Sequence, residues 1–203
     1  MITPTLEIET KFWNRGYSLV CGTDEVGRGS FAGPVMVGAV IFPKDFSGIP
    51  GVADSKLLKP QVREKLSKQI KETALAWSVA SISVAEINKH GIGKATQMAF
   101  RKSIKMLTSN PDFILIDAFY IKHLNRKRQK AVPDGDKICC SIAAASIIAK
   151  VERDQYMRYL HKKYPRYGFA KHKGYGTKQH QSAIKRYGLS RVHRKSFNLE
   201  KFL

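Results

Sequence analysis

Short apolar runs alternate with longer amphipathic stretches along most of the 203 residues. Two apolar runs, Tyr17–Thr23 and Val35–Phe42, predict two strands that a glycine-rich turn joins into an antiparallel hairpin. Apolar and polar residues alternate over Trp77–Val84, which predicts a third strand with one polar face. A fourth run, Phe113–Ile116, predicts a short buried strand that ends at Asp117.

Helical patterns separate and follow these strands. Residues Lys59–Thr73 predict a helix that Pro60 opens near its first turn. A second helix is expected from Ala85 to about Leu107, with a break at Gly91–Gly93, and a long third helix covers Ser141–Tyr164. Three antiparallel strands followed by strand–helix alternation predict an α/β fold with a mixed sheet flanked by helices.

The charge of the chain is strongly positive and unevenly spread. Lysine and arginine total 36 against 16 acidic residues, a net charge of +20, and the stretch from Lys150 onward carries 15 basic and 3 acidic residues. Such a field favours a polyanionic partner, most commonly nucleic acid. An anionic membrane surface is the alternative, but we find no long basic amphipathic helix with a clean apolar stripe. We predict a body over residues 1–160 and a small basic helical lobe over 161–203.

Apolar and cysteine patterns bear on where the protein acts. The longest apolar runs are too short to cross a bilayer. Charged residues Glu7, Glu9 and Lys11 stand where a signal peptide would need an apolar stretch. The three cysteines include an adjacent pair, Cys139 and Cys140, and form no zinc-type pair. We expect a cytoplasmic monomer with reduced thiols and no membrane contact.

Candidate chemistry concentrates at Asp24 and Glu25, which the turn Gly27-Arg28-Gly29 follows. Carboxylates bind hard divalent cations, glycines allow a substrate close to the backbone, and arginine can grip a phosphate. Together these groups indicate phosphodiester chemistry. A charged hairpin turn is the simpler alternative for this motif alone.

Two further acids occupy similar positions. Asp117 ends a predicted strand, where open α/β sheets place their ligands, and Asp136 precedes the long helix. Either acid alone is as well explained by a cap or a turn. With Asp24 and Glu25 they make four carboxylates, the minimum set for two divalent ions.

Six blocks, in the same order, resemble the motifs of type 2 ribonuclease H (ribonuclease HII) over nearly the whole chain. They are Gly22–Pro34, Asp54–Leu58, Ile116–Ala118, Gly135-Asp136 with Ile142–Val151 and Arg153-Asp154, Tyr167–Thr177, and His193–Phe197. The resemblance implies a ribonuclease H-like catalytic domain and a C-terminal lobe that contributes to substrate binding. Arg28 favours type 2 over the type 3 relatives, which usually carry lysine in this turn.

The resemblance also implies the reaction. The family's four acids, here Asp24, Glu25, Asp117 and Asp136, would hold two Mg²⁺ or Mn²⁺ ions. These ions would promote hydrolysis of RNA in RNA–DNA hybrids, and of single ribonucleotides in duplex DNA, on their 5′ side. The products would carry a 5′-phosphate and a 3′-hydroxyl. Because consecutive strand residues face opposite ways, Asp24 and Glu25 can share a site only if the strand distorts or different atoms are used.

Substrate recognition needs a group that senses the 2′-hydroxyl, since this hydroxyl distinguishes RNA from DNA. The resemblance assigns this role to the backbone of Gly27-Arg28-Gly29 and to Tyr175. A core tyrosine with a surface hydroxyl is the alternative for Tyr175. Phosphate contacts are expected for Lys56 and Lys173, although a solvated lysine at a helix start explains Lys56 equally well.

Other basic-tail features lead to weaker expectations. The tail histidines, His172, His180 and His193, are expected to contact phosphate or water, since their spacing is unlike that of a zinc site. Residues Phe197–Leu203 are a possible sliding-clamp docking segment, although the leading glutamine is missing. Two other protein classes remain open. A non-catalytic nucleic-acid-binding protein would keep its function without the acids, and an integrase-like nuclease would cut all-DNA duplexes.

Overall fold

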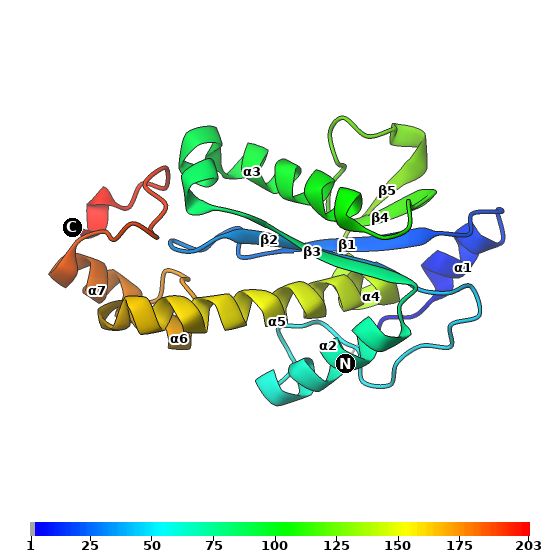
Figure 1. Ribbon diagram of the computed structural model, residues 1–203, viewed down its shortest axis with the longest axis horizontal. Coiled ribbons are helices and arrows are strands. Elements are labelled where there is room, and N and C mark those ends of the chain that lie inside the picture. The colour runs from blue at the N-terminus through cyan, green and yellow to red at the C-terminus, as the bar shows by residue number, and fades with distance from the viewer. Residues whose placement is uncertain (1–2) are drawn as a thin grey trace.

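The computed structural model describes residues 3–203 and has a five-stranded mixed sheet at its centre (Figure 1). The sheet order is β3-β2-β1-β4-β5. Antiparallel pairs join β3 to β2 and β2 to β1, whereas β1–β4 and β4–β5 are parallel. The predicted mixed α/β sheet is therefore confirmed. The strands are β1 (Val20–Val26), β2 (Val35–Ile41), β3 (Ala76–Ile82), β4 (Phe113–Asp117) and β5 (Gln129–Val132).

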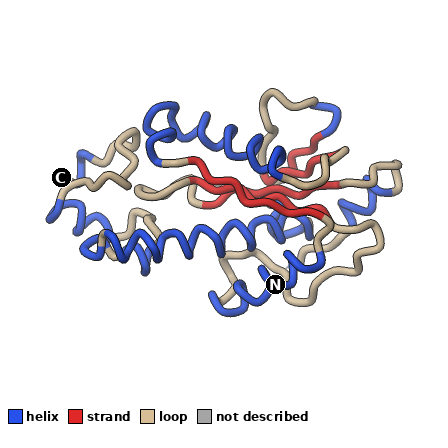
Figure 2. The backbone as a smooth tube through the Cα atoms, viewed as in Figure 1, coloured by secondary structure: helices blue, strands red, loops and turns tan. Residues whose placement is uncertain are grey.

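Helices cover both faces of the sheet (Figures 1 and 2). Helix α3 (Val84–Met106) packs on one face, and α2 (Pro60–Thr73) and α5 (Cys140–Lys163) pack on the other. The shorter helices are α1 (Glu7–Trp13), α4 (Gly135–Ile138), α6 (Phe169–His172) and α7 (Lys178–Tyr187), with 3₁₀ turns at Arg126–Arg128, Pro165–Tyr167 and Glu200–Phe202. None of the helices in residues 3–203 has the length and apolarity needed to traverse a bilayer.

Two glycines let α5 lie directly on the sheet. A Cβ atom added to Gly22 in β1 would come within 2.2 Å of the Ser141 carbonyl carbon, and one added to Gly38 in β2 would come within 2.2 Å of the Ala145 oxygen. Such distances are far inside van der Waals contact, so only glycine fits at either position. The small start of α5 is therefore held close to β1, which brings Ser146 beside Asp24.

The observed elements depart from the sequence predictions in a few places. Strand β1 continues to Val26, so Asp24 and Glu25 belong to a strand and do not lie in the turn. The predicted break in the second helix is confirmed, because Gly91 has a left-handed φ of 76° inside α3. The pattern failed to predict α1 and β5. Strand β5 has only four residues and exposes Lys130, so it lacks a long apolar run.

The C-terminal segment packs against the end of α5 around a cluster of buried histidines. His180 and His193 are fully buried and their Nε2 atoms lie 3.0 Å apart, and the ring of His172 stacks on that of His180. Burial lowers the pKa of His180 and of His193 to about 4, so both rings are neutral at neutral pH. The expectation that these histidines contact phosphate is wrong, because they form the interior of this segment. The division of the chain at residue 160 stays a prediction.

Candidate active site

A cleft of about 250 Å³ opens where β1 and β4 part. The pairing of β1 with β4 ends at Thr23 and Ile116, after which β1 continues beside β2 alone. The carboxyl ends of two parallel strands therefore border an open edge, the usual position of a ligand site in an α/β sheet. The cleft is lined by residues from β1, the glycine turn, the loop before α2, the end of β4 and α5, together with Tyr175.

Asp24 and Glu25 reach this cleft without any distortion of β1. Their partners in β2 are Gly38 and Val37, in a regular register that continues to Val26. Asp24 is 5% exposed and its Oδ1 accepts a hydrogen bond from the Glu25 N–H at 2.7 Å. Glu25 lies 3.7 Å from the guanidinium of Arg28. The two carboxylates share one site because the neighbouring strand has ended, which leaves room beside both faces of β1.

A hydrogen bond to the backbone of the residue before Asp136 places Asp117 and Asp136 close together. Asp117 Oδ1 accepts a hydrogen bond from the Gly135 N–H at 2.8 Å, which fixes the start of α4 next to the end of β4. Asp136, one residue later, is 3% exposed. Its Oδ2 accepts a hydrogen bond from Lys56 Nζ at 3.0 Å. The lysine therefore pairs with an acid of the site, and its predicted phosphate contact stays a prediction.

The electrostatics of the cleft suit a cation. Burial, followed by repulsion from the other acids, raises the pKa of Asp24 well above its usual value. Burial, opposed by Arg28, raises the pKa of Glu25 to about 7. Burial, together with repulsion from Asp136, also raises the pKa of Asp117. A divalent cation would relieve this repulsion, and oxygen-only ligands match Mg²⁺ or Mn²⁺.

Asp24, Glu25 and Asp117 line the cleft, whereas Asp136 does not, and the four carboxylates do not meet at one point. Within residues 3–203, no group of three or more His, Cys, Asp or Glu side chains is arranged to hold a metal ion. The chemistry of the donor set fits a divalent cation, whereas the side chains would have to close around it.

A buried arginine from the C-terminal segment holds the glycine turn. Arg194 is fully buried, and it donates hydrogen bonds to the carbonyls of Gly27 and Arg28, each at 2.7 Å, and of Gly33 at 2.9 Å. No carboxylate among residues 3–203 pairs with it. Burial, then the nearby charge of Arg153, lowers the pKa of Arg194 to about 9. Arg194 lies in the block His193–Phe197, but nothing in the sequence assigns it a role.

A second buried arginine, Arg153 of α5, links the turn to the segment that carries Tyr175. Its Nε donates to the Pro34 carbonyl and its Nη1 to the Lys173 carbonyl, both at 3.0 Å, and its guanidinium lies 5.5 Å from the Tyr175 ring. A Cβ atom on Gly27 would come within 1.9 Å of Arg153 Nε, so the turn can contact this arginine only through glycine. Tyr175 is 37% exposed and lines the cleft.

Lys173 does not line the cleft. Its ammonium donates to the Ala170 carbonyl within α6, and its backbone is left-handed with φ of 53°. Ala118 and Asp134 share this rare conformation. Ala118 directly follows Asp117, and Asp134 lies two residues before Asp136. Strained backbone of this kind concentrates at functional sites. The three positions flank Asp117, Asp136 and Tyr175.

Solved structures that superpose on this chain include ribonucleases of the H type. Ribonuclease H2 from Pyrococcus horikoshii OT3 superposes with a TM-score of 0.73 at 26% identity, and the match covers 91% of this chain and 98% of that one. The ribonuclease HII bound to PCNA from Archaeoglobus fulgidus gives 0.71 at 24% identity, with coverage of 87% and 92%. The acid-lined mixed sheet is thus the scaffold of the ribonuclease H class.

Sequence comparison defines the family. The family model for Ribonuclease HII matches residues 21–200. The Ribonuclease HII of Desulfitobacterium hafniense (strain DSM 10664 / DCB-2) is 47% identical over 196 residues, which are 97% of this chain and 75% of the relative. The chain belongs to the ribonuclease HII family, and it is an endoribonuclease.

Proposed function

We propose that the protein hydrolyses the RNA strand of RNA–DNA hybrids and also cuts at single ribonucleotides embedded in duplex DNA. The observation that carries this proposal is the composition of one cleft, which combines three of the site acids, the glycine turn and Tyr175. Membership of the ribonuclease HII family supports endonuclease action on RNA in hybrids. Cleavage on the 5′ side of the ribonucleotide would leave a 5′-phosphate and a 3′-hydroxyl.

We assign the four acids to two divalent ions, Mg²⁺ or Mn²⁺. When bound, such ions supply an activated water and stabilise the leaving oxygen. The chain's own contribution is a set of anionic oxygens on fixed elements, from β1 (Asp24, Glu25), β4 (Asp117) and α4 (Asp136). Lys56 balances the charge of Asp136 from an ammonium group whose side chain is 72% exposed and can also approach a phosphate.

We assign recognition of the ribose to the glycine turn and Tyr175. Because Arg194 binds the carbonyls of Gly27 and Arg28, the N–H groups of the turn are the donors that we assign to substrate oxygens. The Arg28 side chain is 51% exposed and can grip a phosphate. The Tyr175 hydroxyl would bond the 2′-hydroxyl, which DNA lacks. A substrate contact of Lys173 would require its ammonium to leave the Ala170 carbonyl.

A cleavage assay with matched duplexes tests the proposal. We expect a duplex with one ribonucleotide to be cut on the 5′ side of that residue in Mg²⁺ or Mn²⁺, and to stay intact in EDTA. An all-DNA duplex of the same sequence should stay intact under all conditions. Cleavage of both duplexes at similar rates would instead indicate an integrase-like nuclease. Binding without cleavage would indicate a non-catalytic nucleic-acid-binding protein.

Replacing Tyr175 by phenylalanine should slow cleavage at the ribonucleotide about tenfold, since one hydrogen bond in the transition state is worth on the order of 1 kcal/mol. The ring and its contact with Arg153 remain, so stability should not change. Tyr187→Phe is the matched control, because Tyr187 is similarly exposed and lies outside the cleft. An unchanged rate for Tyr175→Phe would remove this residue from ribose recognition.

Contact with a sliding clamp through Phe197–Leu203, a monomeric state and a cytoplasmic location stay predictions. Within the tail, Leu199 is buried and the ring of Phe202 lies 5.5 Å from that of Phe31. Leu203 is 61% exposed. A clamp partner would therefore bind the end of the tail or displace Phe202 from the body.

A further inference from the structure

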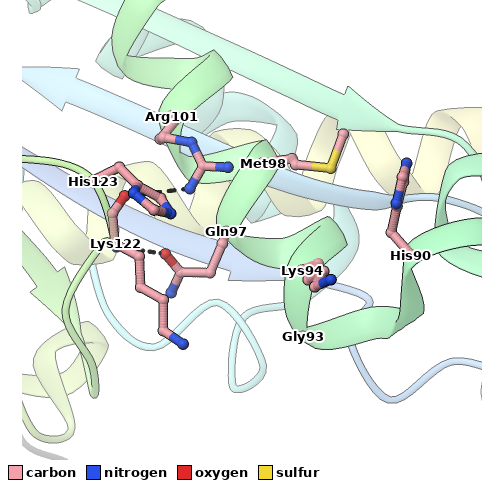
Figure 3. A pocket seen from close by; sticks show the side chains of 8 residues that line it. All are labelled: His90, Gly93, Lys94, Gln97, Met98, Arg101, Lys122 and His123. Carbon is pink, nitrogen blue, oxygen red and sulfur yellow. Dashed lines mark hydrogen bonds between the residues drawn. The ribbon is translucent and has the colours of Figure 1, made fainter.

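A second cleft, of about 310 Å³, lies between α3 and the loop that leaves β4 (Figure 3). Its side chains come from two elements: His90, Lys94 and Arg101 from α3, and Lys122 and His123 from the loop. None of the residues that line it is acidic. The cleft therefore gathers basic groups at one place and is suited to an anion.

The helix contributes its groups from one face. Positions 94, 97 and 101 are separated by three and four residues, the spacing that aligns side chains along one side of a helix. His90 precedes the break at Gly91. His90 lies 3.3 Å from Glu86. Within residues 3–203, no carboxylate pairs with Lys94, Arg101 or Lys122. Three permanent positive charges thus line the cleft without a protein counter-charge.

The loop that completes the cleft is tied firmly to α3. Gln97 accepts a hydrogen bond from the Lys122 N–H at 2.7 Å, and Arg101 donates to the Lys122 carbonyl at 3.3 Å (Figure 3). Gln97 also donates a hydrogen bond to the Tyr120 carbonyl at 3.1 Å. His123 has a left-handed φ of 64°. Strain of this kind persists only where surrounding contacts enforce it. A loop held in this way differs from an ordinary solvated run of lysines.

The same loop connects the second cleft to the active site. Asp117 precedes Lys122 by five residues, so their Cα atoms are at most about 18 Å apart. Phe119, between them, lies 5.3 Å below the guanidinium of Arg28. At a rise of about 3.4 Å per base pair, this limit corresponds to roughly five base pairs of duplex. A duplex seated over the acids therefore has backbone phosphates within reach of the basic cleft.

We propose that this cleft is a phosphate-binding subsite that holds the backbone of the duplex to one side of the cut ribonucleotide. The inference rests on the proposed function, because it takes the duplex bound at the acids as the source of the phosphate. The subsite adds affinity and fixes the direction of the duplex, and it takes no part in bond breaking.

The test compares two double variants with the same change in charge. The cleft variant, Lys94→Gln/Lys122→Gln, removes two positive charges from the cleft. The control variant, Lys65→Gln/Lys89→Gln, removes two exposed lysines that lie outside the cleft. For the cleft variant on a long ribonucleotide-containing duplex, we expect KM to rise roughly tenfold with kcat unchanged. The slope of log Kd against log salt, measured by anisotropy in EDTA, should fall in magnitude by about 1.8, or about 0.9 for each lost phosphate contact.

Truncated duplexes locate the source of the phosphate. One substrate is cut back to three base pairs on the 5′ side of the ribonucleotide, and the other to three base pairs on the 3′ side. The KM of the cleft variant should match that of the wild type on one of these two substrates. An equal defect on both would overturn the proposal, as would an equal defect in the control variant. The proposal would also be overturned if the cleft bound inorganic phosphate at constant ionic strength while the defect of the cleft variant did not depend on duplex length. The ligand of the cleft would then be a free phosphate compound. Wild-type protein that binds duplex through the cleft but never cuts it would contradict the proposed function alone.

Discussion

Replacement of Asp24 by asparagine is expected to abolish cleavage while raising the melting temperature. The loss of activity should be at least about 10³-fold, as for the removal of a central electrostatic group from an active site. Asparagine keeps the oxygen that accepts the hydrogen bond from the Glu25 N–H, so the local geometry can persist. The change therefore removes a charge and little else.

The expected gain in stability follows from the direction of the pKa shift. Burial, together with neighbouring acids, raises the pKa of Asp24 in the folded state above its unfolded value. The protonated form is thus favoured by folding, and this contribution is lost as the pH rises through the folded-state pKa. At neutral pH an ionised Asp24 destabilises the fold. Removal of the charge should raise the melting temperature by about 2–4 °C, the shift produced by ~1 kcal/mol in a domain of this size.

Thermal melts without divalent ions and cleavage assays with Mg²⁺ measure the two effects. Asp45→Asn is the control, because it makes the same chemical change on an exposed residue outside the cleft. Retained cleavage in Asp24→Asn would exclude a catalytic role for this acid. A lower melting temperature would show that ionised Asp24 stabilises the fold, contrary to the electrostatic argument.

The second large effect is expected at Arg194. Arg194→Lys keeps the positive charge but loses the planar fork that reaches three carbonyls at once. The loss of two charge-assisted hydrogen bonds should cost about 3 kcal/mol of unfolding free energy. The turn at Gly27–Gly29 would then be less well placed, and a misplacement of about 1 Å can reduce kcat/KM by roughly 10²-fold.

Assays well below the melting temperature separate positioning from simple unfolding. We expect the defect in Arg194→Lys to persist at temperatures where circular dichroism shows a fully folded protein, and to fall mainly on ribonucleotide-containing substrates. Arg191→Lys is the control on an exposed neighbour. Recovery of full activity on cooling would reduce Arg194 to a purely structural residue.

The sequence predicted four of the five strands and the main helices because each depends on local pattern, and its motifs pointed to acids of which Asp24, Glu25 and Asp117 line one cleft. It could not show how Asp24 and Glu25 share a cleft, since the answer lies in where β4 stops pairing with β1. The tail histidines were misjudged for a related reason. Their basic neighbours suggested a surface role, whereas the fold places His180 and His193 inside.

The contacts of Arg194 are the clearest example of what spacing cannot reveal. The residue is separated from Arg28 by 166 positions, and its partners are backbone carbonyls, which leave no trace in residue type. A buried arginine without an acid is uncommon, so residue type alone gives no sign that Arg194 is buried. Only the three-dimensional arrangement identifies the carbonyls that it binds.

The dependence of the glycine turn on Arg194 also has a consequence during protein synthesis. Ribosomes release the amino-terminal part of a chain first, and β1 with its acids emerges long before residue 194. A nascent chain therefore carries the carboxylates while the turn beside them still lacks its anchor. The turn beside the acids can therefore reach its anchored shape only near the end of translation.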